Sequence, residues 1–216
     1  MSRIVLTGYI VGSYETNVYL LHREEEQDTI LVDPGACGKQ LVDEAEKEGL
    51  HIVAILLTHG HYDHIGSVNE VVKETKARVY MSKDEEKLAQ DTEANLSAKH
   101  NCPVVVYPDY LLNDNEVFTV AGISIRCIFT PGHTGGSCCY YIEDTGDKEN
   151  EAPILLSGDT LFQESVGRTD FPTSSTSRLI SSIQDKLFLL PDETMVYPGH
   201  GGITSIGHEK QFNSMV

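Results

Sequence analysis

The sequence predicts an α/β protein built from two mixed β-sheets packed face to face, with helices on the outside. Short apolar runs rich in β-branched residues alternate with segments of helical periodicity, and no dinucleotide-binding fingerprint accompanies them. The 216 residues are 40% hydrophobic and 23% charged, as in a globular protein with one well-covered core. We therefore expect residues 1–216 to form a single domain.

The first half of the chain contains both kinds of segment. Apolar runs predict strands at 4–6, 18–21, 30–32, 52–57 and 78–81. The run 52–57 is apolar throughout, which is typical of a strand buried on both faces. Helical spacing predicts helices at 39–48 and 66–76, and the polar stretch 84–99 is also predicted to be helical.

The second half is richer in strands. Several strand-like runs lie between residues 104 and 142, broken at 113–115 and at 121–122, and Cys138 and Cys139 are predicted to be core residues. Further strands are predicted at 154–156 and 195–197, with a helix at 177–187. The polar, acidic stretch 143–152 is predicted to be a surface loop.

Charge and composition limit the classes of partner. The net charge of −17 disfavours nucleic acid and anionic membrane surfaces. No apolar run approaches the roughly 18 residues of a membrane span, and we identify no signal peptide. Five cysteines, an odd number without C-x-x-C spacing, indicate a reduced, cytoplasmic protein. The surface pattern favours neither a monomer nor a dimer.

Seven side chains of metal-ligand type each follow a short apolar run. Four belong to one H-x-H-x-D-H motif directly after 52–57, and the other three lie in separate turns: His59, His61, Asp63, His64, His133, Asp159 and His200. Imidazole and carboxylate groups together suit zinc, manganese or iron. Seven ligands are too many for one tetrahedral ion, so the sequence predicts a pair of metal ions and hence an enzyme.

The strength of this prediction differs among the residues. Four ligand-type side chains among six residues favour metal binding over a purely structural role for the motif. His133 and His200 lie in Pro-Gly-His turns, and their positions after strands favour one shared site. Asp159 lies in an ordinary Gly-Asp-Thr turn, but a carboxylate can bridge two cations. The remaining histidines are interpreted as surface or packing residues: His22, His51, His100 and His208.

These motifs resemble the metallo-β-lactamase superfamily over nearly the whole chain, from the Asp33-Pro34-Gly35 turn through the H-x-H-x-D-H motif to the last histidine turn. The resemblance implies an αββα sandwich. It assigns one metal to His59, His61 and His133 and the other to Asp63, His64 and His200, with Asp159 as the bridge. In that arrangement Asp63 and Asp159 are catalytic, and Asp33 is a supporting carboxylate near the ligand loops.

Within the superfamily, residues 158–162 and 165–171 look like the glyoxalase II branch, most of all its short bacterial members without a C-terminal helical domain. The resemblance implies that a metal-bound hydroxide cleaves a small-molecule thioester of the hydroxyacylglutathione type, such as lactoylglutathione. The products would be a hydroxy acid and a free thiol. Two divalent ions are implied, zinc first, with iron or manganese as alternatives. True β-lactamases generally have cysteine at the position of Asp159, which disfavours that activity.

The chain departs from the branch where the thiol is bound. Arg168 and Asp170 occupy positions that are Lys and Tyr in the family, and Gly202 stands where a tyrosine is common. Arg168 is therefore a candidate substrate-binding residue, with a buried pair with Asp170 as its alternative role. A similar Gly-Arg-Thr-Asp-Phe segment occurs in persulfide dioxygenases, which would use one iron held by His59, His133 and Asp159.

A lactonase and a non-catalytic metal-binding protein are the remaining alternatives. Structural zinc sites are closed with four ligands, so seven candidate ligands argue against the non-catalytic role.

Overall fold

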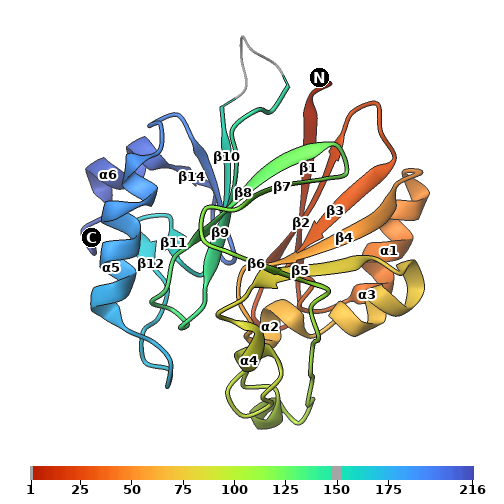
Figure 1. The fold of residues 1–216 in the computed structure, drawn as a ribbon, viewed down its shortest axis with the longest axis horizontal. Coiled ribbons are helices and arrows are strands. Elements are labelled where there is room, and N and C mark those ends of the chain that lie inside the picture. Colours follow the sequence, from red (N-terminus) through yellow and green to blue (C-terminus); the bar gives the residue numbers. More distant parts are fainter. Residues whose placement is uncertain (1, 147–151) are drawn as a thin grey trace.

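The computed structural model of the chain describes residues 2–146 and 152–216. Within this part, two six-stranded mixed sheets face each other, and helices cover their outer faces (Figure 1). The predicted αββα sandwich is thus confirmed. Residues 147–151 of the predicted surface loop 143–152 lie outside the described residues.

The first sheet follows the chain order from its first to its sixth strand. Its strands are β1 (Ile4–Val11), β2 (Thr16–Arg23), β3 (Asp28–Val32), β4 (His51–Leu57), β5 (Arg78–Ser82) and β6 (Tyr110–Leu112). The first three pair antiparallel, whereas β3 to β6 pair parallel. Parallel neighbours need crossover connections, which here include α1 (Gly38–Lys47) and α3 (Val68–Thr75).

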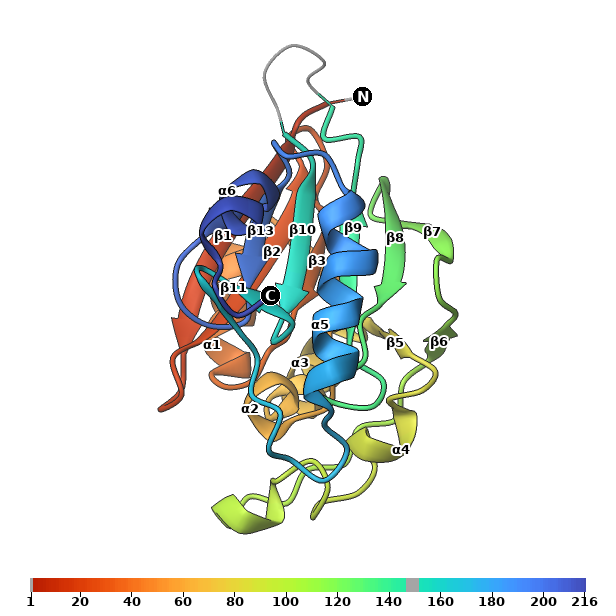
Figure 2. The same cartoon turned by 90° about the vertical axis from the view of Figure 1, so that its left-hand side faces the viewer.

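The second sheet has one parallel pair, β10 with β13, among antiparallel neighbours. In sheet order its strands are β14 (Thr204–Ser205), β13 (Met195–Pro198), β10 (Ile154–Gly158), β9 (Cys138–Ile142), β8 (Ile123–Phe129) and β7 (Val117–Val120). A small hairpin follows β10, formed by β11 (Leu161–Phe162) and β12 (Ser165–Val166). Helices α5 (Thr176–Asp185) and α6 (Ile206–Phe212) cover the outer face (Figure 2), with the short 3-10 helix η2 (Leu187–Leu189) after α5.

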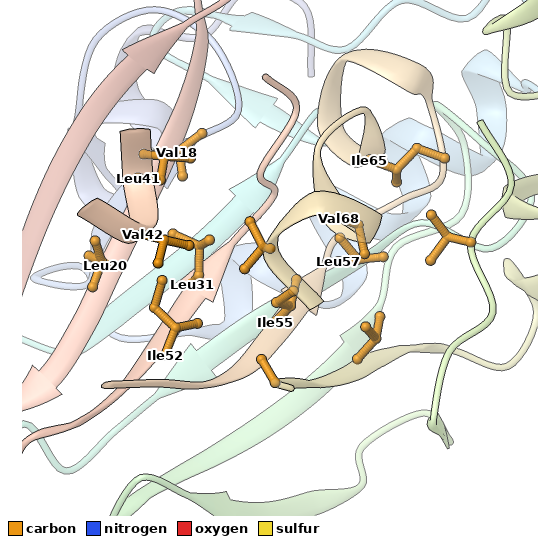
Figure 3. Packing of buried hydrophobic residues seen from close by; sticks show 14 of the residues in the cluster. Val18, Leu20, Leu31, Leu41, Val42, Ile52, Ile55, Leu57, Ile65 and Val68 are labelled. Carbon is orange, nitrogen blue, oxygen red and sulfur yellow. The ribbon is translucent and has the colours of Figure 1, made fainter. Parts of the chain in front are cut away.

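Three apolar layers hold the sandwich together. Leu41 and Val68 of the helices pack with Ile55 between helices and first sheet (Figure 3). Leu56, the next residue of β4, belongs instead to the layer between the two sheets, together with buried Tyr140. The third layer lies under α5 and α6. Neighbouring residues of β4 are therefore buried on opposite faces, as predicted for an uninterrupted apolar strand.

The predicted helix 66–76 is confirmed as α3, which covers residues 68–75. A short helix that was not predicted, α2 (Tyr62–Ile65), precedes it, and between the two helices the Ser67 N–H donates to the carbonyl of Pro34 at 2.9 Å. Helix α2 therefore begins inside the ligand motif. Within residues 2–146 and 152–216, none of the helices combines the length and the apolar character that a membrane span requires.

The predicted helix 84–99 was wrong over most of its length. Only α4 (Glu86–Ala89) and the 3-10 helix η1 (Ala98–His100) form there. The Asp91 carboxylate accepts the N–H groups of residues 93 and 94, and the Asn95 amide donates to the carbonyls of Ala89 and Val104. Side chains thus replace the backbone bonds that would continue a helix.

Candidate metal centre

The predicted ligands meet at one edge of the sandwich, because each follows the carboxyl end of a strand. The motif at 59–64 follows β4, His133 follows β8, Asp159 follows β10 and His200 follows β13. The two sheets are joined at this edge by a hydrogen bond of 2.9 Å from the Cys138 N–H to the carbonyl of Thr58. Residues distant in sequence are thereby placed on one rigid scaffold.

All seven predicted ligands belong to three overlapping clusters of the described residues. In each cluster the potential ligand atoms lie within 4.8 Å of one another. The clusters are His59, His61 and His133; His59, His64 and Asp159; and Asp63, His64 and His200. The first and third contain the histidines and the carboxylate that the family resemblance assigns to separate ions, and the second joins them.

Asp159 lies between the two sets of histidines. Its Oδ2 is 3.5 Å from Nε2 of His133, and its Oδ1 is 3.4 Å from Nε2 of His64 and 3.7 Å from Nε2 of His200. One carboxylate oxygen therefore faces each set, which is the geometry needed for a bridging ligand.

The tautomer of His59 follows from its neighbours. The hydroxyl of Thr58 donates to Asp33 Oδ2 at 2.6 Å, because an ionised carboxylate can only accept. Its oxygen then accepts from Nδ1–H of His59 at 3.2 Å. Nε2 of His59 is left unprotonated and free to bind a cation.

Three further imidazoles are held in the same way through Nδ1. His64 donates to Asp33 Oδ2 at 3.0 Å, His133 to the carbonyl of Arg168 at 2.8 Å, and His200 to the carbonyl of Tyr14 at 3.0 Å. Carbonyl oxygens only accept, so Nδ1 of His133 and of His200 carries the proton. Such supporting bonds orient ligating histidines in metal proteins.

Burial and charge hold most of the cluster in the protonation state that binds metal. Burial lowers the pKa of His59 and His133 and lowers that of His61 to about 3, so these rings are neutral. Burial acts to raise the pKa of Asp159, but the charge of His64 outweighs it and holds this carboxyl ionised. Burial opposes a charge on His64, yet the surrounding carboxylates, Asp159 first, raise its pKa.

The residues present fit a divalent metal. Three buried polar atoms of the ligand cluster have no hydrogen-bond partner among the described residues: Nε2 of His59, Nε2 of His61 and Oδ1 of Asp159. Buried unpaired polar atoms are costly, by about 1–3 kcal/mol each. A cation among them would satisfy the lone pair of His59 and the carboxylate oxygen of Asp159, and the imidazole–carboxylate donor set suits zinc, iron or manganese.

A pocket of about 450 Å³ opens over the cluster. Tyr62 and His100 stack in one wall with ring centroids 4.5 Å apart, and Tyr14 meets both edge-on. In another part of the lining, the ring of Phe171 lies edge-on to His61 and His133, with centroids 4.7 and 5.5 Å apart. The pocket therefore joins the candidate ligands to an aromatic lining.

The structure adds to the roles expected of two residues. His100 is exposed and packs on Tyr62, as expected, and it also lines the pocket. Arg168 does pair with Asp170, by bonds of 3.0 and 2.7 Å, but the two side chains are 70% and 64% exposed rather than buried. Both Arg168 and Lys99 line the pocket.

Several lining residues were missed by the sequence reasoning, namely Tyr14, Tyr62, Leu96, Lys99, Phe162 and Phe171. Tyr62 lies within the H-x-H-x-D-H motif, so its adjacency to Asp63 was an available signal. Nothing in the local sequence of Tyr14 or Lys99 indicates the pocket.

The sequence profile of the metallo-beta-lactamase superfamily matches residues 11–200. A probable metallo-hydrolase, YqgX of Bacillus subtilis, is 34% identical over 205 residues, 94% of this chain and 93% of the relative. The hydroxyacylglutathione hydrolase GloC of Haemophilus influenzae is 31% identical over 206 residues, again 94% and 93% of the two chains.

Solved structures resemble the chain equally widely. The B3 metallo-beta-lactamase BLEG-1 has a TM-score of 0.89 and 33% identity, covering 97% of this chain and 98% of its own. TTHA1623, solved in a di-iron-bound form, has a TM-score of 0.82 and 31% identity, covering 97% and 100%.

Proposed function

The chain belongs to the metallo-β-lactamase superfamily, and from this premise we propose that it is a metal-dependent hydrolase of small-molecule thioesters. The proposed substrate is of the hydroxyacylglutathione type, such as lactoylglutathione, and the products are a hydroxy acid and a free thiol. The similarity to GloC supports this substrate class. The described cysteines are all free, which supports work in a reducing compartment such as the cytoplasm.

The position of Asp159 carries the proposal, because one of its oxygens faces each histidine set. We propose that His59, His61 and His133 hold one divalent ion, that Asp63, His64 and His200 hold the other, and that Asp159 lies between them. Zinc is the expected ion, with iron or manganese as alternatives. When bound, such a pair polarises a carbonyl oxygen and lowers the pKa of a water molecule.

The chain's own groups hold this arrangement rigid. Asp33 and Thr58 fix the rings of His64 and His59, and the carbonyls of Tyr14 and Arg168 fix the other two. Rings held in one orientation need little rearrangement during the reaction, which favours catalysis.

Asp63 is the carboxylate best placed to act on the attacking water. It lines the pocket, and its side chain is 19% exposed, whereas that of Asp159 is 11% exposed. Its Oδ2 faces His200 at 3.3 Å, so the other oxygen can accept a hydrogen bond from water and orient it toward the substrate carbonyl.

The pocket lining supports an anionic substrate. The net charge of −17 repels a substrate whose thiol part carries carboxylate groups, so binding it needs a local cation. Lys99 and Arg168 both line the pocket and can supply one. The stacked rings of Tyr62 and His100 offer a flat apolar surface beside Asp63. Together these groups could hold the charged and apolar parts of one thioester.

Hydrolysis of lactoylglutathione by the protein loaded separately with zinc, iron and manganese tests the proposal. We expect release of free thiol, detected with a chromogenic thiol reagent, together with about two bound ions per chain. Metal-loaded protein that releases no thiol from lactoylglutathione or from an uncharged acyl thioester would overturn it.

Two other reactions are separate arms of that test. The structural similarity to BLEG-1 favours β-lactam hydrolysis as the second candidate, measured with a chromogenic cephalosporin. Oxygen consumption with a persulfide and a single bound iron would instead support a dioxygenase and overturn the hydrolase. Lactone hydrolysis is measured in the same series.

A further inference from the structure

Glu85 is a buried carboxylate that joins two ligand loops. The residue is 1% exposed. Its Oε1 accepts the Gly60 N–H at 3.0 Å, and its Oε2 accepts the Gly136 N–H at 2.8 Å. Gly60 lies between His59 and His61, and Gly136 lies in the same loop as His133. The Glu85 side chain therefore connects two loops, one from each sheet.

The two loops also pack directly on the backbone around Glu85. A Cβ on Gly60 would lie 2.8 Å from Leu88 Cδ2 and 3.1 Å from the nitrogen of Ala89. A Cβ on Gly136 would lie 2.4 Å from the nitrogen of Glu85. Both positions need glycine because the segment leaves no space for a side chain.

Glu85 forms no ion pair among the described residues, so its buried carboxylate is stabilised by the N–H groups of the two loops and not by a cation. Burial raises the pKa of Glu85 to about 7, whereas the N–H groups of Gly60 and Gly136 and the hydroxyl of Thr134 act to lower it. Burying a carboxylate without a cation is unfavourable. An apolar residue here would, however, leave two buried N–H groups unpaired.

We propose that Glu85 is a positioning residue of the metal centre, which fixes the distance between the His59–His61 loop and the His133 loop. The cluster of His59, His61 and His133 draws its ligands from both loops. The cluster of Asp63, His64 and His200 contains no residue of the His133 loop. Substitution of Glu85 should therefore weaken the first cluster selectively.

Titration with cobalt(II) against a chromophoric chelator tests this selectivity. Glu85→Gln is placed in two backgrounds: Asp63→Ala, which keeps the first cluster intact, and His200→Ala, which does the same. A third background, His61→Ala, keeps the cluster of Asp63, His64 and His200. We expect Glu85→Gln to weaken cobalt binding about 10–100-fold in the first two backgrounds and less than about threefold in the third.

The matched control is Asp84→Asn, which removes the negative charge of the exposed residue directly before Glu85. It should leave binding unchanged in all three backgrounds. Equal affinities with and without Glu85→Gln, or an equal loss in every background, would overturn the proposal. The cobalt absorption spectrum gives a second readout, since a changed spacing of the three imidazoles alters the ligand field in the first two backgrounds.

A measurement on the unsubstituted chain covers the case in which Glu85→Gln does not fold. The amide protons of Gly60 and Gly136 should exchange slowly with solvent, because Glu85 accepts both. Exchange as fast as in an exposed loop would also overturn the proposal. The inference rests on the proposed metal centre but not on the reaction: a chain that binds metal and cleaves no thioester would overturn only the reaction.

Discussion

Asp33 lies 3.0 Å from His64, with Oδ2 of the carboxylate accepting from Nδ1 of the ring. The same oxygen accepts the hydroxyl of Thr58, whose own oxygen accepts from His59. One carboxylate therefore orients two candidate ligands, His64 directly and His59 through Thr58. Asp33 adopts a left-handed backbone conformation, with φ of 51°, which aspartate and asparagine tolerate better than most residues.

Asp33→Asn should weaken metal binding about 10–100-fold while the chain stays folded. The amide keeps the shape and tolerates the backbone conformation, but its NH₂ group cannot accept, so at least one supporting bond is lost. Chelator competition measures the affinity. Asp43→Asn, at a half-buried helix residue paired with Lys39 and remote from the ligand motifs in sequence, is the control. Equal affinity in Asp33→Asn and this control would contradict the prediction.

Asp63→Ala should lower the bound metal from two ions to about one per chain. Thioester hydrolysis should fall by about a hundredfold, because one source of charge stabilisation is lost with the carboxylate. Metal analysis of the purified variant and thiol release measure the two effects. If the Asp63→Ala variant hydrolyses the thioester as fast as the unsubstituted chain does, the assignment of the second metal is wrong.

Arg168 and Asp170 form an exposed ion pair that should tune affinity for the acidic part of a substrate. Arg168→Gln should raise KM for an anionic thioester a few-fold, whereas Asp170→Asn should lower it, because it frees the guanidinium. Neither change should affect KM for an uncharged thioester. Similar shifts for both substrates would show that the pair acts on the shape of the pocket rather than on charge.

The raised pKa of Glu85, about 7, should make stability depend on pH in the metal-free chain. A folded-state pKa above the ordinary value favours the protonated form. The stabilisation that this raised pKa contributes to the free energy of unfolding is complete below about pH 4.5 and is lost as pH rises through 7. Relative to Glu85→Gln, the unsubstituted chain should lose about 2–3 kcal/mol between pH 5 and pH 8.

Urea unfolding of both metal-free proteins at several pH values measures that difference. The histidines of the cluster titrate in both proteins, so their contribution cancels in the comparison. Parallel stability curves for the two proteins would contradict the raised pKa.

Local sequence was sufficient to predict those strands and breaks whose physical cause lies in neighbouring residues. The run 52–57 is apolar on every residue and forms β4, buried on both faces. The breaks at 113–115 and 121–122 fall between strands, as predicted. The predicted helix 84–99 failed because Asn95 bonds to Val104, a contact that helical periodicity does not report.

The sequence by itself determined the αββα sandwich and the seven candidate ligands, because strand patterning and the spacing of imidazoles and carboxylates are written along the chain. Only the tertiary structure decided which groups support and surround them. The stack of His100 on Tyr62 and the span of Glu85 between two loops depend on segments that meet only when both sheets pack together. Such contacts arise from packing of the whole chain and have no signature in any one segment.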